Sequence, residues 1–151
     1  MYDGKYYLVW GPKELVLTRE VRDETSKDNK IKLATNYPGG WKWTKTVDAN
    51  NSTVNWVRLA ANEQSGSTGK TTISLLIDVA NPINAGDRIA FMHFSAGRMD
   101  ISVKITQTDK TKVFINIFDA NGNEVSGTTL WVNAIAGKEV EKLLFVEWGP
   151  A

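Results

Sequence analysis

Two tryptophan rings two positions apart are the residues in this sequence best suited to a binding chemistry. Trp41 and Trp43 follow the turn-forming segment Tyr37–Gly40 and are separated by Lys42. On an extended strand, side chains two positions apart point to one face at a spacing of about 7 Å. Indole rings contact the C–H faces of sugars through dispersion and their π-faces. The spacing therefore predicts a sugar-stacking platform, with a buried strand face or a protein interface as the two alternatives.

Polar side chains near these rings would supply the hydrogen bonds that sugar hydroxyls require. We expect three rings to contact the ligand and three polar side chains to bind its hydroxyls. The expected ligand-binding set is Trp41, Trp43, Tyr37, Asn36, Arg58 and Gln64, and Asn50, Asn51 and Asn55 are further polar candidates.

Catalytic groups are sparse in this sequence. His93 is the single histidine, and it alternates with apolar residues in the run 90–94. Ser95, Asp87 and Asp100 lie nearby in sequence, but a catalytic triad requires a geometry that sequence proximity does not supply. Nothing selects a carboxylate pair from the 17 acidic residues. We therefore interpret His93 as a structural or surface residue and predict a protein without catalytic residues, not an enzyme.

Two short segments look like ligand loops and depart from the required spacing. Gly66–Thr71 has two residues before its Gly-Lys-Thr where a phosphate-binding loop has four. Asp119–Glu124 has oxygen-bearing side chains at alternate positions, but it lacks the glycine and glutamate of the helical calcium loop. Its Asn-Gly pair predicts a hairpin turn instead. We expect no cofactor, while a calcium ion held by distant loops stays open and no metal ligand is assigned.

Composition and charge exclude several classes of function. The chain has 151 residues and no cysteine, so disulfides, thiolate metal sites and cysteine nucleophiles are excluded. A formal charge of +1 argues against binding nucleic acid through its phosphates. The longest apolar runs fall far short of the roughly 20 residues that a membrane-spanning helix needs. The segment Met1–Lys5 also lacks the basic-then-apolar order of a secretion signal. We expect no nucleic-acid or membrane partner.

The elements that must position these residues are strands. Alternating or β-branched runs recur throughout the chain and are separated by turn residues, and no helical apolar stripe is present. This pattern predicts a single all-β domain over residues 1–151, a two-sheet antiparallel β-sandwich of nine to ten strands with jelly-roll or immunoglobulin-like connections and no long helix. The expected strands are Tyr6–Trp10, Leu15–Val21, Lys42–Val47, Val54–Leu59, Ile73–Val79, Arg88–Phe94, Ile101–Ile105, Val113–Phe118, Thr128–Val132 and Val140–Trp148.

Three polar segments interrupt the strand pattern and are expected to be long loops that could carry binding groups. They are Arg22–Lys30, Asn36–Gly40 and Ala61–Lys70. The triplet Trp-Gly-Pro occurs at 10–12 and again at 148–150, which suggests that the first and last strands pair.

A cysteine-free, tryptophan-rich β-sandwich of this size resembles, by fold class and composition, the non-catalytic carbohydrate-binding modules attached to glycoside hydrolases. The resemblance implies binding of a plant-type polysaccharide, a glycoside hydrolase as the attached partner, and an extracellular location as an excised module. The alternative function is a structural or interaction subunit of a viral or phage particle or of a bacterial surface assembly, for which a cytoplasmic or virion location would fit. The oligomeric state, the glycan and the binding face are left open.

Overall fold

The computed structural model describes residues 1–111, 113–118, 121 and 145–150. The chain divides into two compact units, Met1–Lys110 and Thr111–Ala151, and each is described by itself. The first unit contains a complete two-sheet sandwich. The prediction that one sandwich domain runs over all 151 residues stays a prediction.

The first sheet has four antiparallel strands in the order β1-β2-β4-β7. They are β1 (Tyr2–Asp3), β2 (Tyr6–Gly11), β4 (Lys30–Thr35) and β7 (Gly69–Ser74). Side chains alternate between the two faces of a strand. Leu8, Ile31, Leu33 and Ile73 therefore face inward and are buried.

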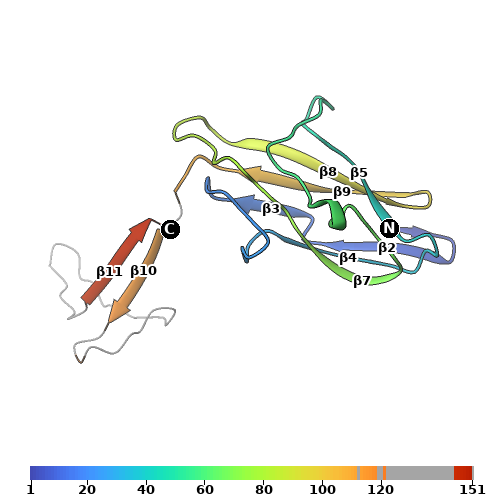
Figure 1. Cartoon of the computed structure of the whole chain (residues 1–151), viewed down its shortest axis with the longest axis horizontal. Coiled ribbons are helices and arrows are strands. Elements are labelled where there is room, and N and C mark those ends of the chain that lie inside the picture. Colours follow the sequence, from blue (N-terminus) through green and yellow to red (C-terminus); the bar gives the residue numbers. More distant parts are fainter. Residues whose placement is uncertain (112, 119–120, 122–144, 151) are drawn as a thin grey trace, which may run out of the picture. The chain divides into compact units, whose positions relative to one another are not determined.

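The second sheet has five strands in the order β3-β9-β8-β5-β6. They are β3 (Glu14–Leu17), β9 (Met99–Gln107), β8 (Arg88–Ala96), β5 (Trp41–Val47) and β6 (Ser65–Gly66). All pairs are antiparallel except β3, which runs parallel to β9. The two sheets form the two layers seen in Figure 1, with β2, β4 and β7 in one layer and β5, β8 and β9 in the other.

This arrangement confirms the predicted fold class. The nine strands of the first unit form two mostly antiparallel sheets, and the described residues contain no helix longer than the three-residue 3₁₀ turn η1 (Ala61–Glu63). The order of strands places β2, β4 and β7 in one sheet and β5, β8 and β9 in the other. With β2, β4, β5, β7, β8 and β9 taken as strands A, B, C, E, F and G, this is the immunoglobulin-like alternative, in which A, B and E oppose C, F and G.

The core lies between the inward faces of the sheets. The two nine-residue strands β8 and β9 are neighbours in the five-stranded sheet. Along most of each strand, every second residue is buried. Their buried apolar residues are Ala90, Met92, Phe94, Ala96, Met99, Ile101, Val103 and Ile105. These strands agree with the expected runs Arg88–Phe94 and Ile101–Ile105, because long alternation is the clearest strand signal in a sequence.

A buried polar cluster holds the end of the sandwich where β9 finishes. The Gln107 side chain is fully buried, and its Oε1 accepts a hydrogen bond from Arg88 Nε at 2.9 Å. Its Nε2 donates to the carbonyls of Thr18 and Glu20 at 3.0 and 2.9 Å. One guanidinium and two backbone carbonyls are thus tied to one amide, which joins β8 and β9 to the segment that follows β3.

The expected strand Ile73–Val79 is a strand only at Ile73 and Ser74, where β7 ends, and two further predictions differ more. Strand β4 lies between the expected loops Arg22–Lys30 and Asn36–Gly40, where no strand was expected. It is nevertheless a central strand, because Ile31 and Leu33 fill the core between β2 and β7. The prediction of a strand at Val54–Leu59 is wrong. This segment has one isolated bridge, at Arg58, and the residue before it, Thr53, has another.

The expected pairing of the two Trp-Gly-Pro triplets is also wrong. Trp10 lies on β2 and is paired with Leu33 of β4. Trp148 lies in the second unit, where β10 (Val113–Phe118) and β11 (Phe145–Pro150) form an antiparallel pair with Trp148 opposite Ile115. The expected strand Thr128–Val132 and all but Asn121 of the segment Asp119–Glu124 lie outside the described residues.

Candidate functional site

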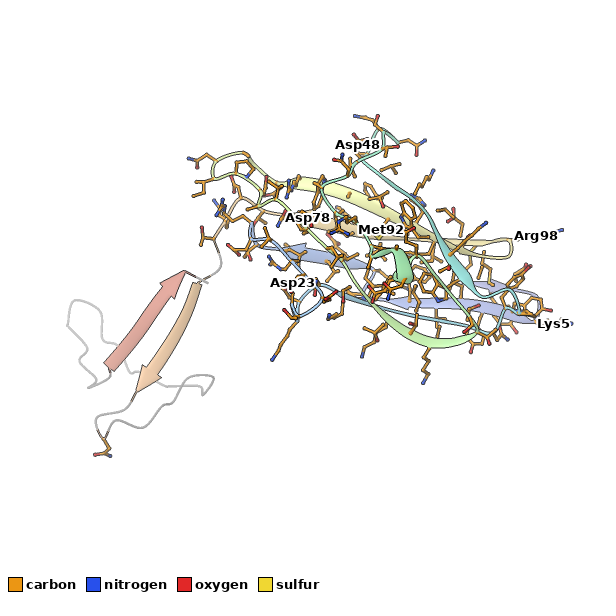
Figure 2. All side chains as sticks on the ribbon, viewed as in Figure 1. Lys5, Asp23, Asp48, Asp78, Met92 and Arg98 are labelled. Atoms are coloured by element: carbon orange, nitrogen blue, oxygen red, sulfur yellow. The ribbon has the colours of Figure 1, made fainter. Side chains whose placement is uncertain are left out.

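Three connections of the sandwich converge at the end opposite Gln107. They are the β4–β5 connection at residues 36–40, the segment around β6, and the β8–β9 turn at residues 97–98. Figure 2 shows Arg98 at this end together with Lys5, away from Asp23. Two of these segments belong to the loops expected from the sequence, Asn36–Gly40 and Ala61–Lys70.

A pocket of about 690 Å³, called here the end pocket, lies between these connections. Its lining combines hydroxyl groups, one ammonium group, two aromatic side chains and four glycines. The lining residues are Tyr37, Gly39, Gly40, Trp41, Lys42, Ser65, Gly66, Ser67, Ser95 and Gly97. The volume falls in the range of roughly 300–1,000 Å³ typical of ligand pockets, and the polar lining favours a polar ligand.

Glycines allow the walls of the end pocket to approach one another. Gly40 has φ +73°, a left-handed conformation that favours glycine, and a Cβ at this position would collide with the carbonyl oxygen of Gly66. Cβ atoms at Gly39 and Gly97 would each lie 2.7 Å from the ring of Tyr37. The ring of Tyr37 is therefore held between two backbone segments that only glycine permits so close.

Trp41 is buried at the inner wall of the end pocket. Its side chain is only 3% exposed and contacts Phe94 edge-on, with ring centroids 5.8 Å apart. Its indole Nε1 is buried beside Gly66 and has no hydrogen-bond partner among the described residues. A buried donor without an acceptor is unfavourable by roughly 1–3 kcal/mol. This N–H is therefore a group that a ligand or a water molecule could complete.

Tyr37 is half-buried at the rim of the same pocket. Its ring meets the ring of Tyr6 edge-on, with centroids 5.4 Å apart and an interplanar angle of 83°. The backbone N–H of Tyr37 donates to the Thr35 hydroxyl, and its carbonyl accepts from the Gly40 N–H at 2.9 Å. Because backbone and ring are both held, Tyr37 presents a fixed aromatic surface.

The two-ring platform expected at the surface is not present. Trp43 does face the same side of β5 as Trp41, as the spacing predicts, but that side is the inside of the sandwich. Trp43 is half-buried against the core, and its Nε1 donates to the Thr46 hydroxyl at 2.9 Å. The prediction of two open rings is wrong because the strand pairing of β5 turns both of them inward. The buried-face alternative describes this pair.

Two of the predicted polar residues lie beside the end pocket with their groups already engaged. The Asn36 side chain accepts from the Tyr7 N–H at 2.7 Å and donates to the Lys5 carbonyl at 3.0 Å. The Gln64 carbonyl accepts from the Trp43 N–H at 2.8 Å, and its exposed side chain makes a long contact of 3.4 Å to the Leu59 carbonyl. Neither residue lines the pocket.

Arg58 does not belong to the pocket lining either. Its guanidinium forms a two-point contact with the Asp78 carboxylate at 2.7 and 3.0 Å, and both side chains are exposed. The hydrogen bond to Asp78, followed by the attraction between the charges, raises the pKa of Arg58. The hydrogen bond from Arg58 in turn lowers the pKa of Asp78. This pair acts as a surface ion pair.

The structure places His93 beside Asp100 on the outer face of the five-stranded sheet. His93 faces outward from β8, and its Nδ1 lies 3.8 Å from Asp100 Oδ1, beyond hydrogen-bond distance. Within the described ranges, no three His, Asp or Glu side chains come together as a metal site.

Sequence reasoning selected Tyr37 and Trp41 but missed the other polar groups of the pocket. Ser65 and Ser67 come from the segment around β6, Ser95 lies near the end of β8, and Lys42 was read only as a spacer between the tryptophans. A usable signal exists, because each of the three converging segments carries glycine next to these residues. That signal says which segments can approach closely, but not that they meet.

Comparison with protein-family models found no match for this chain. A search of curated proteins also found no match. Across the part of the chain that the structure describes, no helix has the length and apolar character needed to cross a membrane.

Proposed function

We propose that this chain is a non-catalytic binding domain whose end pocket holds a sugar unit of a neutral plant-type polysaccharide. One observation carries the proposal. The end pocket combines the Tyr37 ring and the edge of Trp41 with three serines and Lys42, and its lining contains no carboxylate. Hydroxyl donors and acceptors beside an aromatic ring are what a sugar requires, because its hydroxyls and its C–H faces must both be contacted.

The unpartnered indole N–H of Trp41 supports the same proposal. A sugar hydroxyl is a neutral acceptor, so it could accept this hydrogen bond without bringing a charge into a buried position. The recognition differs from the platform expected from the sequence. Trp41 contributes its polar edge, and Tyr37 contributes the ring surface.

Filling the pocket from an exposed position tests this function without disturbing the core. Ser67 is exposed, so Ser67→Tyr places a bulky ring in the pocket, while Ser52→Tyr adds the same ring at an exposed turn elsewhere. We expect the unmodified chain to be retarded in affinity gels that contain a glucan or a xylan. Ser67→Tyr should weaken this binding at least tenfold, and Ser52→Tyr should leave it unchanged.

The proposal fails if no neutral polysaccharide is bound, or if both tyrosine variants bind as the unmodified chain does. Sedimentation should be measured on the same samples. A stable oligomer that binds no glycan would favour the alternative, a structural subunit of an assembly.

A further inference from the structure

A second hollow, called here the sheet groove, lies on the outer face of the four-stranded sheet. It has a volume of about 590 Å³ and is lined by β2, β4 and β7. It shares no residue with the end pocket. The two hollows are therefore separate features, one at the end of the sandwich and the other on a sheet face.

Small side chains in the middle of this face create the groove. Gly11 pairs with Lys32, which pairs with Thr72 across β2, β4 and β7. In the next outward-facing row, Val9 pairs with Ala34, which pairs with Lys70. Gly11, Ala34 and Thr72 rise little above the sheet, while the longer side chains of the two rows surround them. Val9 is 48% exposed, so it offers an apolar contact inside the groove.

The charge of this face has one sign. Lys32 and Lys70 are exposed and occupy diagonal positions on the neighbouring strands β4 and β7. Long side chains at diagonal positions are close enough to interact. Neither ammonium has an ion-pair partner among the described residues. Lys30 lies on the same face, and its Nζ donates only to neutral oxygens, the Ser74 hydroxyl and the Glu24 carbonyl. No outward-facing position of β2, β4 or β7 carries a carboxylate.

The outer face of the five-stranded sheet is different. There Lys104 Nζ lies 3.8 Å from Glu14 Oε1, and His93 lies at the same distance from Asp100. Lys104 on that face lies beside a carboxylate, although Lys42 and Lys45 form no ion pair, whereas none of the lysines around the sheet groove has such a neighbour among the described residues. Like charges near one another on a sheet are mildly unfavourable. An anionic ligand would remove that repulsion.

We propose that the sheet groove binds a carboxylated polysaccharide, a polyuronate, with Lys32 and Lys70 pairing with carboxylates and Val9 contacting a sugar face. The groove lies over the face of β2, β4 and β7, whose shared ladders are already paired, so an extended acidic peptide in it would add no backbone hydrogen bonds to those ladders. The aromatic residue in its lining, Trp10, is half-buried on the core side of β2, where its Nε1 donates to the Ser102 carbonyl, so its ring is not presented for base stacking as in a single-stranded nucleic-acid site. A charged sugar chain needs only the cations and the apolar contact that the groove provides.

The test uses the full chain and polygalacturonate as the probe, titrated at low ionic strength. Lys32→Gln with Lys70→Gln removes both groove charges. Lys27→Gln with Lys45→Gln is the matched control, because it removes two exposed lysines away from the groove. We expect the groove variant to bind about tenfold more weakly, since two exposed charge contacts are lost. The control should change by less than twofold, and added salt should weaken binding by the unmodified chain.

Four results would overturn the proposal: no binding of polygalacturonate by the unmodified chain, equal weakening in both lysine variants, equal affinity for polyglutamate, or equal weakening by Ser67→Tyr. The last result would move the polyuronate to the end pocket. Because the neutral-glycan test of the end pocket uses different probes and variants, either site can fail without the other.

Discussion

The two ends of the sandwich differ in the hydrogen bonding of one buried side chain at each end, Gln107 at one and Trp41 at the other. At the end where β9 finishes, the amide of Gln107 is fully buried and bonded through both of its polar atoms. At the other end, the buried indole N–H of Trp41 has no partner among the described residues. Gln107 is satisfied by its own hydrogen bonds at the first end, although Asn29 Oδ1 just before β4 is also buried without a partner in the described chain, and the second end leaves a donor beside a pocket. The comparison contrasts an end that the hydrogen bonds of Gln107 hold together with an end whose pocket we propose as a binding site.

The largest effect is expected from breaking the closed end. Gln107→Leu keeps a similar volume but leaves the Thr18 and Glu20 carbonyls and the Arg88 guanidinium without a buried partner. We expect a loss of about 3 kcal/mol in the free energy of unfolding, measured by urea denaturation. Gln64→Leu is the control, because its amide is exposed and should change stability by less than about 0.5 kcal/mol. Equal losses in the two variants would remove the distinction between the ends.

The next effect concerns the close approach at the open end. Gly66→Ala would place a methyl group against the indole ring of Trp41, a rigid neighbour that cannot rotate away within the core. We expect a loss of about 2 kcal/mol, as for other overpacked positions, seen as a lower denaturation midpoint. Gly11→Ala meets nothing within 4 Å and should be nearly neutral. A neutral Gly66→Ala would mean that β6 can move off Trp41, so the wall of the end pocket would be adjustable.

A smaller effect separates an indole N–H with a partner from one without. Trp10 Nε1 donates to the Ser102 carbonyl at 3.1 Å, whereas Trp41 Nε1 has no such acceptor in the described chain. Trp41→Phe should therefore lose only buried area, about 1 kcal/mol. Trp10→Phe should lose at least as much although Trp10 is half-exposed, because it also breaks a hydrogen bond. Thermal or urea unfolding of both variants measures this. A loss above about 3 kcal/mol for Trp41→Phe would show that its N–H is satisfied in solution.

The smallest effect is the pH dependence of the stability that the exposed ion pair of Arg58 and Asp78 contributes. The hydrogen bond from Arg58 lowers the pKa of Asp78 below its ordinary value of 3.8, so the folded state holds the proton less tightly than the unfolded state. The resulting stability is present above pH 3.8 and is lost as the pH falls through the lowered pKa. Asp78→Asn should flatten this acid dependence slightly, as measured by unfolding at a series of acidic pH values. An unchanged acid slope would mean that the pair contributes nothing.

Several parts of the fold could be predicted from sequence, and others could not, for identifiable reasons. Strands β8 and β9 are long and alternate cleanly, so their faces were predictable. Strand β4 is short, and its two inward residues stand among lysines and threonine, so it resembled the polar loops beside it. Val54–Leu59 has strand-forming residues, but it bends and makes only isolated bridges at its borders. The residue types of this segment favoured a strand, but no neighbouring strand pairs with it along its length.

The candidate site divides in the same way. Tyr37 and Trp41 were selectable because aromatic residues beside a glycine-containing turn are typical of binding surfaces. Ser67 and Ser95 were not, because single serines are common and only the three-dimensional meeting of the segment around β6 with the end of β8 places them in one pocket. Lys32 and Lys70 are equally ordinary in sequence, and strand register alone makes them neighbours.

The sequence by itself determined that this protein is built from strands, that it has no thiol chemistry, and that Trp41 and Trp43 share one side of a strand. These properties follow from residue types and from a repeat of two, both of which are local. Only the tertiary structure decided that the shared side is the inside, because the pairing of β5 with β8 and the opposing sheet set which face meets the core. It also decided that a buried indole edge, and not an open pair of rings, borders the pocket.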